Sequence, residues 1–394
     1  MPDVDLPFSR QEYADRLTRV RASMEARGIE VLVAADPSNM SWLTGYDGWS
    51  FYTPQAVVVT HDGEPWWWGR RMDANGARRT VYMDEAQILD YSDDHVMSTE
   101  RHAFGQLAGL LDGMGHGSAR VGVELDNYYY SAAAHQHLCA GLPDAEVLDA
   151  TALVNWQRGV KSDRELEYMR RGARIVERMH ARIRDVIQPG MRKCDLVAEI
   201  YATGISGTEE FGGDYPAFVP MMPTGADASA PHLTWDDKPL KVGEGTFFEI
   251  AGAYRRYQLP LCRTTFLGTP PDDMRRAEKA VLNGLDAGLA AARAGNRAKD
   301  VATDFYATME AAGFHKEGRC GYPIGISYPP DWGERTISFR TTDETVLQPG
   351  MTFHFMPGLW MDTWGLEITE SIVITEDGPA EPLADVPRAI YVKG

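Results

Sequence analysis

The sequence predicts an α+β protein of two domains, and three observations support this prediction. Its 394 residues exceed the usual size of a single domain. Up to about residue 158, short apolar strands alternate with helical patterns, which is typical of a small α/β unit. Beyond that point, long amphipathic helices are interleaved with further strands. We therefore expect one domain over residues 1–158 and a second over residues 159–394.

The first domain is expected to begin with a helix over residues 9–27. Ser9 can cap its first turn, apolar residues follow at helical spacing, and Gly28 can end it. The tryptophans at 66–68 fall in an expected strand, where such large side chains usually pack in a core or an interface. Apolar runs and helical patterns place the remaining elements at 31–35, 56–60 and 121–123 (strands) and at 98–113 and 130–141 (helices).

A long amphipathic helix is expected to open the second domain. Ser162 and Glu165 have the spacing of a capping box, in which each side chain bonds the backbone amide of the other residue. The apolar stripe continues to Val186, and the Gln-Pro-Gly sequence at 188–190 then ends the helix. Periodicity predicts further helices at about 272–294 and 298–313, and strands at 245–251, 260–267, 351–356 and 366–375.

Charge and composition exclude several partners and locations. Lys and Arg number 39 against 57 Asp and Glu, and a formal net charge of −18 repels nucleic acids and anionic lipids. No apolar run approaches the ~18 residues of a membrane span, and the opening MPDVDLPFSR does not resemble a secretory signal. The four cysteines are widely spaced, which supports neither a zinc knuckle nor a disulfide framework. We expect a cytoplasmic protein that binds neither nucleic acid nor membrane.

Two residues of the second domain are candidates for chemistry on local sequence alone. Glu249 lies in the apolar strand Phe-Phe-Glu-Ile-Ala-Gly, on one face with Phe247 and Ala251. Burying an unpaired carboxylate is unfavourable, so a buried Glu249 would have a function, whereas an exposed one would need none. His232 follows a proline in a loop of small residues, and a lone histidine there is more often packed or exposed than catalytic.

Five motifs occur in an order and spacing that resemble the creatinase/aminopeptidase, or pita-bread, family, and this resemblance covers residues 10–380. The motifs are Lys161–Leu166, the loop around His232, Glu249–Gly252 with Arg263 and Thr264 downstream, Leu347–Met351 and Ile374–Gly378. The resemblance implies a smaller creatinase-like N-terminal α/β domain and a catalytic C-terminal pita-bread domain. It also implies a homodimer in which the N-terminal domain reaches the partner's active site.

The metallopeptidases of this family hold two metal ions with two Asp, one His and two Glu. By the same resemblance, the equivalent positions here are Glu249, Pro260, Tyr322, Met356 and Thr369. Proline and methionine do not ligate hard metal ions, and one carboxylate cannot offset the charge of two such ions. We therefore expect neither a metal nor another cofactor.

Two metal-free groups of the family offer further comparisons. His232 falls at the position of the catalytic histidine of creatinase, but the carboxylates that grip the guanidinium there fall on Cys262 and Met356. The segment 43–52, Leu-Thr-Gly-Tyr-Asp-Gly-Trp-Ser-Phe-Tyr, and the strand at 248–252 resemble the ectoine hydrolases. A creatinase-like amidinohydrolase acting on another small cation and a non-catalytic pita-bread binding module are the alternatives.

The resemblance to the ectoine hydrolases implies a reaction and a site. The cyclic amidine ring of ectoine would open to N-acetyl-2,4-diaminobutyrate, with Glu249 as nucleophile or base and His232 as acid or base. Aromatic rings would enclose the flat cation, or would instead pack at the domain interface. The substrate-binding candidates are Tyr46, Trp49, Tyr52, Tyr257 and Trp360. The expected partners are the zwitterionic substrate, a second copy of the chain and a downstream deacetylase.

Overall fold

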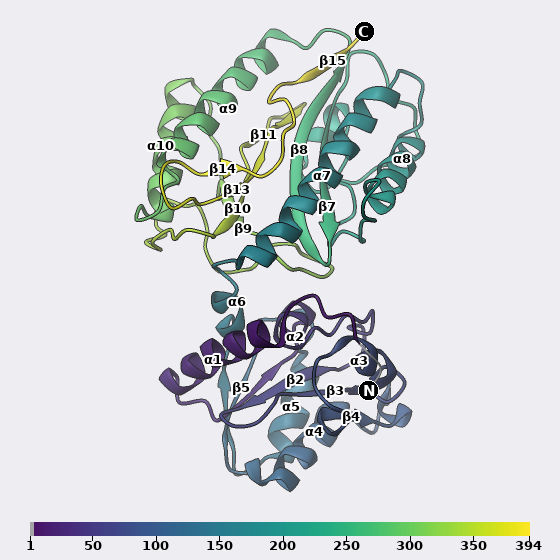
Figure 1. Cartoon of the computed structure of the whole chain (residues 1–394). Helices are drawn as coiled ribbons and strands as arrows, with labels where there is room; N and C mark the ends of the chain where they lie inside the picture. Colours follow the sequence, from purple (N-terminus) through teal and green to yellow (C-terminus); the bar gives the residue numbers. More distant parts are fainter. Residues whose placement is uncertain (1–3) are drawn as a thin grey trace. The chain divides into compact units, whose positions relative to one another are not determined.

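The computed structural model describes residues 4–394, and the chain divides into two compact units between Arg158 and Gly159 (Figure 1). The combination of helices with parallel and antiparallel strands confirms the predicted α+β class. No helix within residues 4–394 has both the length and the apolar character that crossing a bilayer requires. Each unit has its own sheet structure, so the two are described in turn.

A six-stranded mixed sheet forms the centre of the first unit. Its strands are β1 (Val31–Ala34), β2 (Ala56–Thr60), β3 (Trp66–Arg70), β4 (Ile88–Tyr91), β5 (Arg120–Val123) and β6 (Glu146–Asp149). They lie in the order β4-β3-β2-β1-β5-β6. The pairs β1–β2 and β2–β3 are antiparallel, whereas β3–β4, β1–β5 and β5–β6 are parallel. The four strands predicted in this domain, at 31–35, 56–60, around 66–68 and at 121–123, are therefore confirmed.

The helices of the first unit are α1 (Arg10–Ala26), α2 (Pro37–Thr44), α3 (Ala74–Thr80), α4 (Ala103–Leu111), α5 (Ala132–Gly141) and α6 (Leu153–Gln157). Short helical turns are η1 (Glu85–Gln87), η2 (Asp93–His95) and η3 (Asp112–His116). The predicted cap of α1 is confirmed, because the Ser9 hydroxyl accepts the Glu12 amide at 3.1 Å. Helix α4 begins later than predicted, because the hydroxyl of Ser98 accepts the amides of Glu100 and Arg101 and forms a turn there.

Helices α4 and α5 contribute to a core that also includes side chains of the sheet. Phe104 and Leu107 of α4 belong to one buried cluster with Val31, Val33 and Trp68. Trp67 and Trp68 are fully buried, which confirms the interpretation of the tryptophan run as core packing. The large aromatic side chains of β3 therefore stabilise the first unit by removing apolar surface from water.

Helix α7 (Asp163–Val186) opens the second unit with the predicted capping box. The Ser162 hydroxyl accepts the Glu165 amide at 3.3 Å, and the Glu165 carboxylate accepts the Ser162 amide at 2.9 Å. The amides of Ser162 and Glu165, which have no partner within the helix, are thereby paired. The buried stripe of α7 then lies along the two longest strands of the unit (Figure 1).

Those two strands, β7 (Gly245–Tyr254) and β8 (Tyr257–Leu267), form an antiparallel hairpin that carries the candidate site. All eleven residues of β8 are buried, and so are nearly all of β7. Gly172 of α7 and Gly252 of β7 permit a very close approach, because a Cβ at Gly252 would lie 2.1 Å from the carbonyl oxygen of Gly172. The helix can therefore lie directly on the outer face of the hairpin.

The remaining elements are α8 (Lys193–Ser206), η4 (Gly225–Ser229), α9 (Asp272–Ala291), α10 (Ala298–Ala311), β9 (Gly321–Pro323), β10 (Thr352–Phe355), β11 (Gly358–Trp360), β12 (Gly365–Glu367), β13 (Glu370–Val373), β14 (Glu381–Pro382) and β15 (Tyr391–Lys393). They complete sheets of order β14-β13-β10-β9, β11-β12 and β15-β8-β7. The single strand predicted at 366–375 is wrong, because β12 and β13 belong to different sheets. The break occurs at Thr369, whose amide donates to the carbonyl of Cys262 on β8.

Candidate active site

Glu249 of β7 has a buried carboxyl group, with only 7% of the residue exposed. The backbone is held on both sides at this point, because Glu249 exchanges two 3.1 Å hydrogen bonds with Met221 and pairs with Cys262 of β8. The Cys262 thiol therefore lies on the same face of the hairpin as the carboxyl group. Burial raises the pKa of Glu249 well above its usual range, so this carboxyl group keeps its proton to a higher pH than an exposed glutamate does.

A second buried carboxyl group, that of Glu367 on β12, lies close enough to influence the first. Thr264 of β8 holds its backbone: the Thr264 hydroxyl donates to the Glu367 carbonyl and accepts its amide, both at 2.9 Å. Within residues 4–394, neither side-chain oxygen of Glu367 has a conventional hydrogen-bond partner, although the weakly donating thiol of Cys262 lies against them. Burial raises the pKa of Glu367 to about 7, and Glu367 in turn raises that of Glu249.

The ammonium group of Lys316, a residue that is 6% exposed, counteracts the rise in pKa of both carboxyl groups. Its ammonium group donates to the Gly358 carbonyl at 3.1 Å. Burial lowers the pKa of Lys316 to about 8, against the opposing effect of Glu367 and Glu249. Two carboxyl groups and one ammonium group thus share a poorly solvated space, where the protonation of each depends on the others.

Trp360 of β11 forms one wall beside these charges. The Lys316 ammonium lies over its indole ring, 4.2 Å from the ring centroid. Trp360 also packs against a small buried cluster of Ala228, Phe247 and Cys262. Its ring nitrogen Nε1 is buried and has no hydrogen-bond partner within the described residues. Trp360 therefore lies beside the strand of Glu249, and its indole ring contacts a cation of the chain itself. A contact of Trp360 with substrate stays a prediction.

A chain of buried hydrogen bonds runs behind the carboxyl pair. The Trp332 ring nitrogen donates to the Tyr322 hydroxyl at 2.8 Å, and that hydroxyl shares a 2.9 Å bond with Nδ1 of His354. Nε2 of His354 shares a 2.8 Å bond with the Thr369 hydroxyl, which also accepts the Cys262 amide at 2.8 Å. These bonds join strands β8, β9 and β10 to the Thr369 segment.

This chain can exist in two protonation arrangements. Burial lowers the pKa of His354 to about 3, so its imidazole is neutral and carries one N–H. Either Tyr322 donates to Nδ1 and Nε2–H points to Thr369, or Thr369 donates to Nε2 and Nδ1–H points to Tyr322. In the second arrangement the Tyr322 proton is available to another acceptor. Burial and the neighbouring Glu249 raise the pKa of Tyr322 well above its usual range.

The structure leaves the predicted acid or base His232 exposed. It lies in a turn shortly after η4, and it makes no hydrogen bond or ion pair with another residue of 4–394. Ala228 of η4 packs against Phe247 and Cys262, so the loop that carries His232 begins next to the carboxyl pair. His232 is thus exposed, which is one of the alternatives drawn from the sequence. Its catalytic role stays a prediction.

Tyr257, another predicted substrate-binding residue, is fully buried at the start of β8. Its hydroxyl donates to the Glu165 carboxylate at 2.7 Å. Because Glu165 also completes the capping box, Tyr257 connects the hairpin to the start of α7. The structure thus assigns this hydroxyl a structural contact, and a contact with substrate stays a prediction.

The other three predicted aromatic residues belong to the first unit. Tyr46 is buried, its hydroxyl bonds that of Ser50, and its ring lies 5.2 Å from that of Trp67. Trp49 and Tyr52 are instead 58% and 61% exposed. Tyr46 is therefore a core residue of its unit, whereas Trp49 and Tyr52 present large apolar surfaces to the outside of the chain.

The residues at the family's metal-binding positions do not fit a pair of metal ions. Tyr322 and Thr369 are occupied by the hydrogen bonds to His354, and the remaining positions are Glu249, Pro260 and Met356. No group of three or more His, Cys, Asp and Glu side chains within 4–394 is arranged to hold a metal ion.

Three buried polar residues of this region were missed by sequence reasoning. Glu367 lies between Leu366 and Ile368, and His354 lies between two phenylalanines. A polar residue inside an apolar strand was the signal that identified Glu249, and the same signal could have found both. Lys316 follows a helix in a polar stretch, where a buried lysine has no local signal.

Comparisons with known proteins identify both halves of the chain. The creatinase/prolidase N-terminal domain matches residues 16–160, and metallopeptidase family M24 matches residues 167–376. The ectoine hydrolase of Halomonas elongata is 58% identical over the full length of both chains. An uncharacterised hydrolase/peptidase of Sinorhizobium fredii is 42% identical over 98% of this chain and 99% of the relative.

Solved structures of the same architecture cover nearly the whole chain. A prolidase from Thermococcus sibiricus matches with a TM-score of 0.84 at 17% identity, covering 98% of this chain and 100% of that one. An Xaa-Pro dipeptidase from Bacillus anthracis matches with a TM-score of 0.81 at 18% identity, covering 97% and 100%. At these identities the likeness shows the fold: a creatinase-type N-terminal domain and a pita-bread C-terminal domain.

Proposed function

The chain belongs to the creatinase/aminopeptidase family, and on that premise we propose that it hydrolyses the cyclic amidine ring of ectoine. The observation that carries the proposal is the buried carboxyl group of Glu249 in a chain 58% identical to an ectoine hydrolase over its full length. Ectoine is a flat amidinium cation with a ring carboxylate. A buried carboxyl group is the complement that such a cation requires in a poorly solvated site.

Glu249 is the proposed nucleophile or base. A bound amidinium favours the carboxylate form of Glu249 and so displaces the proton that burial favours. The carboxylate then attacks the amidine carbon, one ring C–N bond breaks, and water releases the N-acetyl product from the enzyme. Alternatively, the carboxylate takes a proton from a water molecule that attacks the same carbon. Both routes consume one water molecule and yield N-acetyl-2,4-diaminobutyrate.

The departing ring nitrogen must receive a proton, and His232 is its proposed donor. The resemblance to creatinase supports this role, and histidine is the side chain that most often acts as a general acid or base in enzymes. Tyr322 is a second candidate, because its hydroxyl lies in the electrostatic reach of Glu249 and is backed by His354 and Thr369. In the arrangement in which Thr369 donates to Nε2, the Nδ1–H of His354 donates a hydrogen bond to the tyrosinate that the proton transfer leaves.

The proposed reaction needs no metal ion. The residues at the family's ligand positions lack the carboxylates and histidine that two ions require, so each proton and bond change above is assigned to a side chain or water. Lys316 supplies the positive charge of the site, and we propose that its ammonium also attracts the ring carboxylate of the substrate.

A product assay tests the proposed function. The purified chain is incubated with ectoine, or with creatine as the substrate of a related amidinohydrolase, and the products are identified by mass spectrometry. We expect a mass gain of one water from ectoine and no product from creatine. Turnover of creatine alone would favour the amidinohydrolase alternative, and no turnover of any small cation would favour a non-catalytic module.

Substitution of Glu249 tests the mechanism. Glu249→Gln keeps the shape of the side chain but loses both nucleophile and base, so we expect no measurable turnover with unchanged circular dichroism. Glu376→Gln, at an exposed position, is the matched control and should keep full activity. A covalent adduct on Glu249 in the intact-mass spectrum of a slow variant would identify the nucleophilic route. Near-normal rates in Glu249→Gln would remove the residue from both roles.

A further inference from the structure

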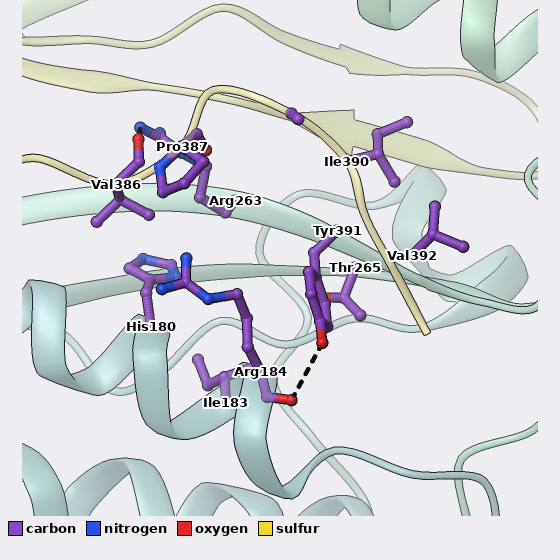
Figure 2. A pocket seen from close by; sticks show the side chains of 11 residues that line it. His180, Ile183, Arg184, Arg263, Thr265, Val386, Pro387, Ile390, Tyr391 and Val392 are labelled. Carbon is purple, nitrogen blue, oxygen red and sulfur yellow. Dashed lines mark hydrogen bonds between the residues drawn. The ribbon is translucent and has the colours of Figure 1, made fainter. Parts of the chain in front are cut away.

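A cavity of about 310 Å³ lies on the outer side of β8, between α7 and the segment Val386–Val392 (Figure 2). Helix α7 contributes His180, Ile183 and Arg184, and β8 contributes Arg263 and Thr265. Its size is at the lower end of the range of small-molecule sites. None of its lining residues belongs to the carboxyl pair or the hydrogen-bond chain described above.

The cavity is cationic in a strongly acidic protein. The formal net charge of the chain is −18, yet two arginines and no aspartate or glutamate line this space. The guanidinium of Arg263 is fully engaged, because it donates to the carbonyls of Cys262, Thr369, Val386 and Pro387 and to the Glu370 carboxylate. Its charge is therefore balanced by Glu370.

Arg184 is the unbalanced charge. Its guanidinium makes no hydrogen bond or ion pair with any residue of 4–394, although the side chain is half-buried. Figure 2 shows it extending beside His180 within the cavity. Burial lowers the pKa of His180 to about 3, so the ring is neutral and does not repel a second charge. An arginine in this setting is a fork of donors suited to a carboxylate.

Apart from the two arginines, His180 and Thr265, the side chains that line the cavity are largely apolar. The side chains that surround the two arginines are Ile183, Val386, Pro387, Ala389, Ile390 and Val392, with the ring of Tyr391. The Tyr391 hydroxyl is turned away to the Arg184 carbonyl at 3.5 Å (Figure 2). The walls therefore offer contact to hydrocarbon rather than to a sugar or a phosphate.

We propose that this cavity binds a small organic monocarboxylate with a branched or cyclic hydrocarbon body. The carboxylate would pair with Arg184, and the body would fill the space between Ile183 and the C-terminal segment. The site is independent of the proposed hydrolysis. The cavity nevertheless adjoins the candidate active site. Arg263 donates to the carbonyls of Cys262 and Thr369, and the Cys262 amide and the Thr369 hydroxyl bond each other within that site.

Calorimetric titration of the full chain tests the proposal, with cyclohexanecarboxylate as the probe and cyclohexylmethanol as its neutral counterpart. We expect the carboxylate to bind, and the alcohol to bind at least about tenfold more weakly, because a charge-assisted hydrogen bond is lost. Arg184→Gln should weaken carboxylate binding by about the same factor and leave that of the alcohol unchanged. The control Arg178→Gln, exposed on the same helix, should have no effect.

Two further variants locate the site. Ala389→Trp, at an exposed edge of the cavity, should fill it and abolish binding. Glu249→Gln should bind the probe as the unchanged chain does, since the candidate active site is separate. The proposal is overturned if the carboxylate does not bind, if Arg184→Gln binds it equally well, or if Glu249→Gln loses binding.

Discussion

The ammonium group of Lys316 lies 4.2 Å from the centroid of the Trp360 ring. This contact gives Trp360 a role besides the predicted one, because the indole stabilises a cation of the chain itself. Trp360 and the Gly358 carbonyl together hold the ammonium beside Glu249 and Glu367. The charge balance of the candidate site therefore depends on Lys316, which lies in the loop after α10.

We expect Lys316→Met to move the acidic limb of the pH profile of kcat/KM to higher pH by about one unit. Without the ammonium, the effect of burial on the two carboxyl groups is offset less, and their pKa values rise further. Lys316→Arg keeps the charge and should keep the profile close to that of the unchanged chain. A loss of activity at all pH values with no shift of the profile would contradict the electrostatic role.

His232→Ala is expected to lower kcat by roughly 10²–10⁴ with a smaller effect on KM, as for other general acids and bases. The matched comparison is Tyr322→Phe, which removes one hydroxyl from the buried hydrogen-bond chain. Steady-state rates of both variants distinguish the two candidates for proton transfer. Unchanged turnover in His232→Ala together with a large loss in Tyr322→Phe would assign the proton transfer to Tyr322.

Activity should survive prolonged treatment with a strong chelator. The family's ligand positions hold Pro260, Tyr322, Met356 and Thr369 together with Glu249, a set that cannot bind two ions. Metal analysis of the purified protein and rates before and after chelation check this expectation. Stoichiometric metal, with activity lost on its removal and restored on its return, would favour a metallohydrolase instead.

The stability of the protein should fall as the pH rises from about 5 to 8 through the titration of Glu367. Its pKa is near its ordinary value in the unfolded chain but is raised to about 7 by burial in the folded one. Folding therefore favours the proton, and stability is lost as the pH rises through the folded value, by about 1–3 kcal/mol. Urea denaturation gives the free energy of unfolding at both pH values. The difference between the two should be smaller in Glu367→Gln than in the unchanged chain, whereas Glu376→Gln should keep the full difference.

Trp49 and Tyr52 should contribute to a homodimer. They are 58% and 61% exposed in the single chain, and exposed rings of this size are typical of interfaces. Sedimentation velocity at assay concentration should give a dimer, and the double variant Trp49→Ala/Tyr52→Ala should shift it toward the monomer. A fully active monomer of the unchanged chain would rule out a partner's contribution to the active site.

Much of the fold follows from local sequence. The capping box at Ser162 and the cap at Ser9 are local signals, and both are confirmed at the predicted residues. The strand predicted at 366–375 fails because its division depends on a distant contact. The Thr369 amide bonds Cys262, more than a hundred positions earlier, and no local pattern reports that.

The candidate site divides in the same way. Glu249 is identifiable because its own strand is apolar on both faces, and its burial is confirmed. Tyr322 and Thr369 stand out in the sequence only as positions where metal ligands are absent. The structure joins them through His354 into one chain of hydrogen bonds, a relationship that depends on strand register. Lys316 comes from a loop, so its burial depends entirely on tertiary packing.

The short strand β15 has a consequence for biosynthesis. It completes its sheet by pairing parallel to β8, and the Lys393 side chain bonds the last carbonyls of α7. The ribosome makes β15 about 120 residues after β8, so the edge of β8 stays open while the intervening chain is translated. Open apolar edges invite pairing with other chains. A nascent chain in this interval therefore carries an unpaired edge of β8, whereas all six strands of the first unit's sheet have already been made.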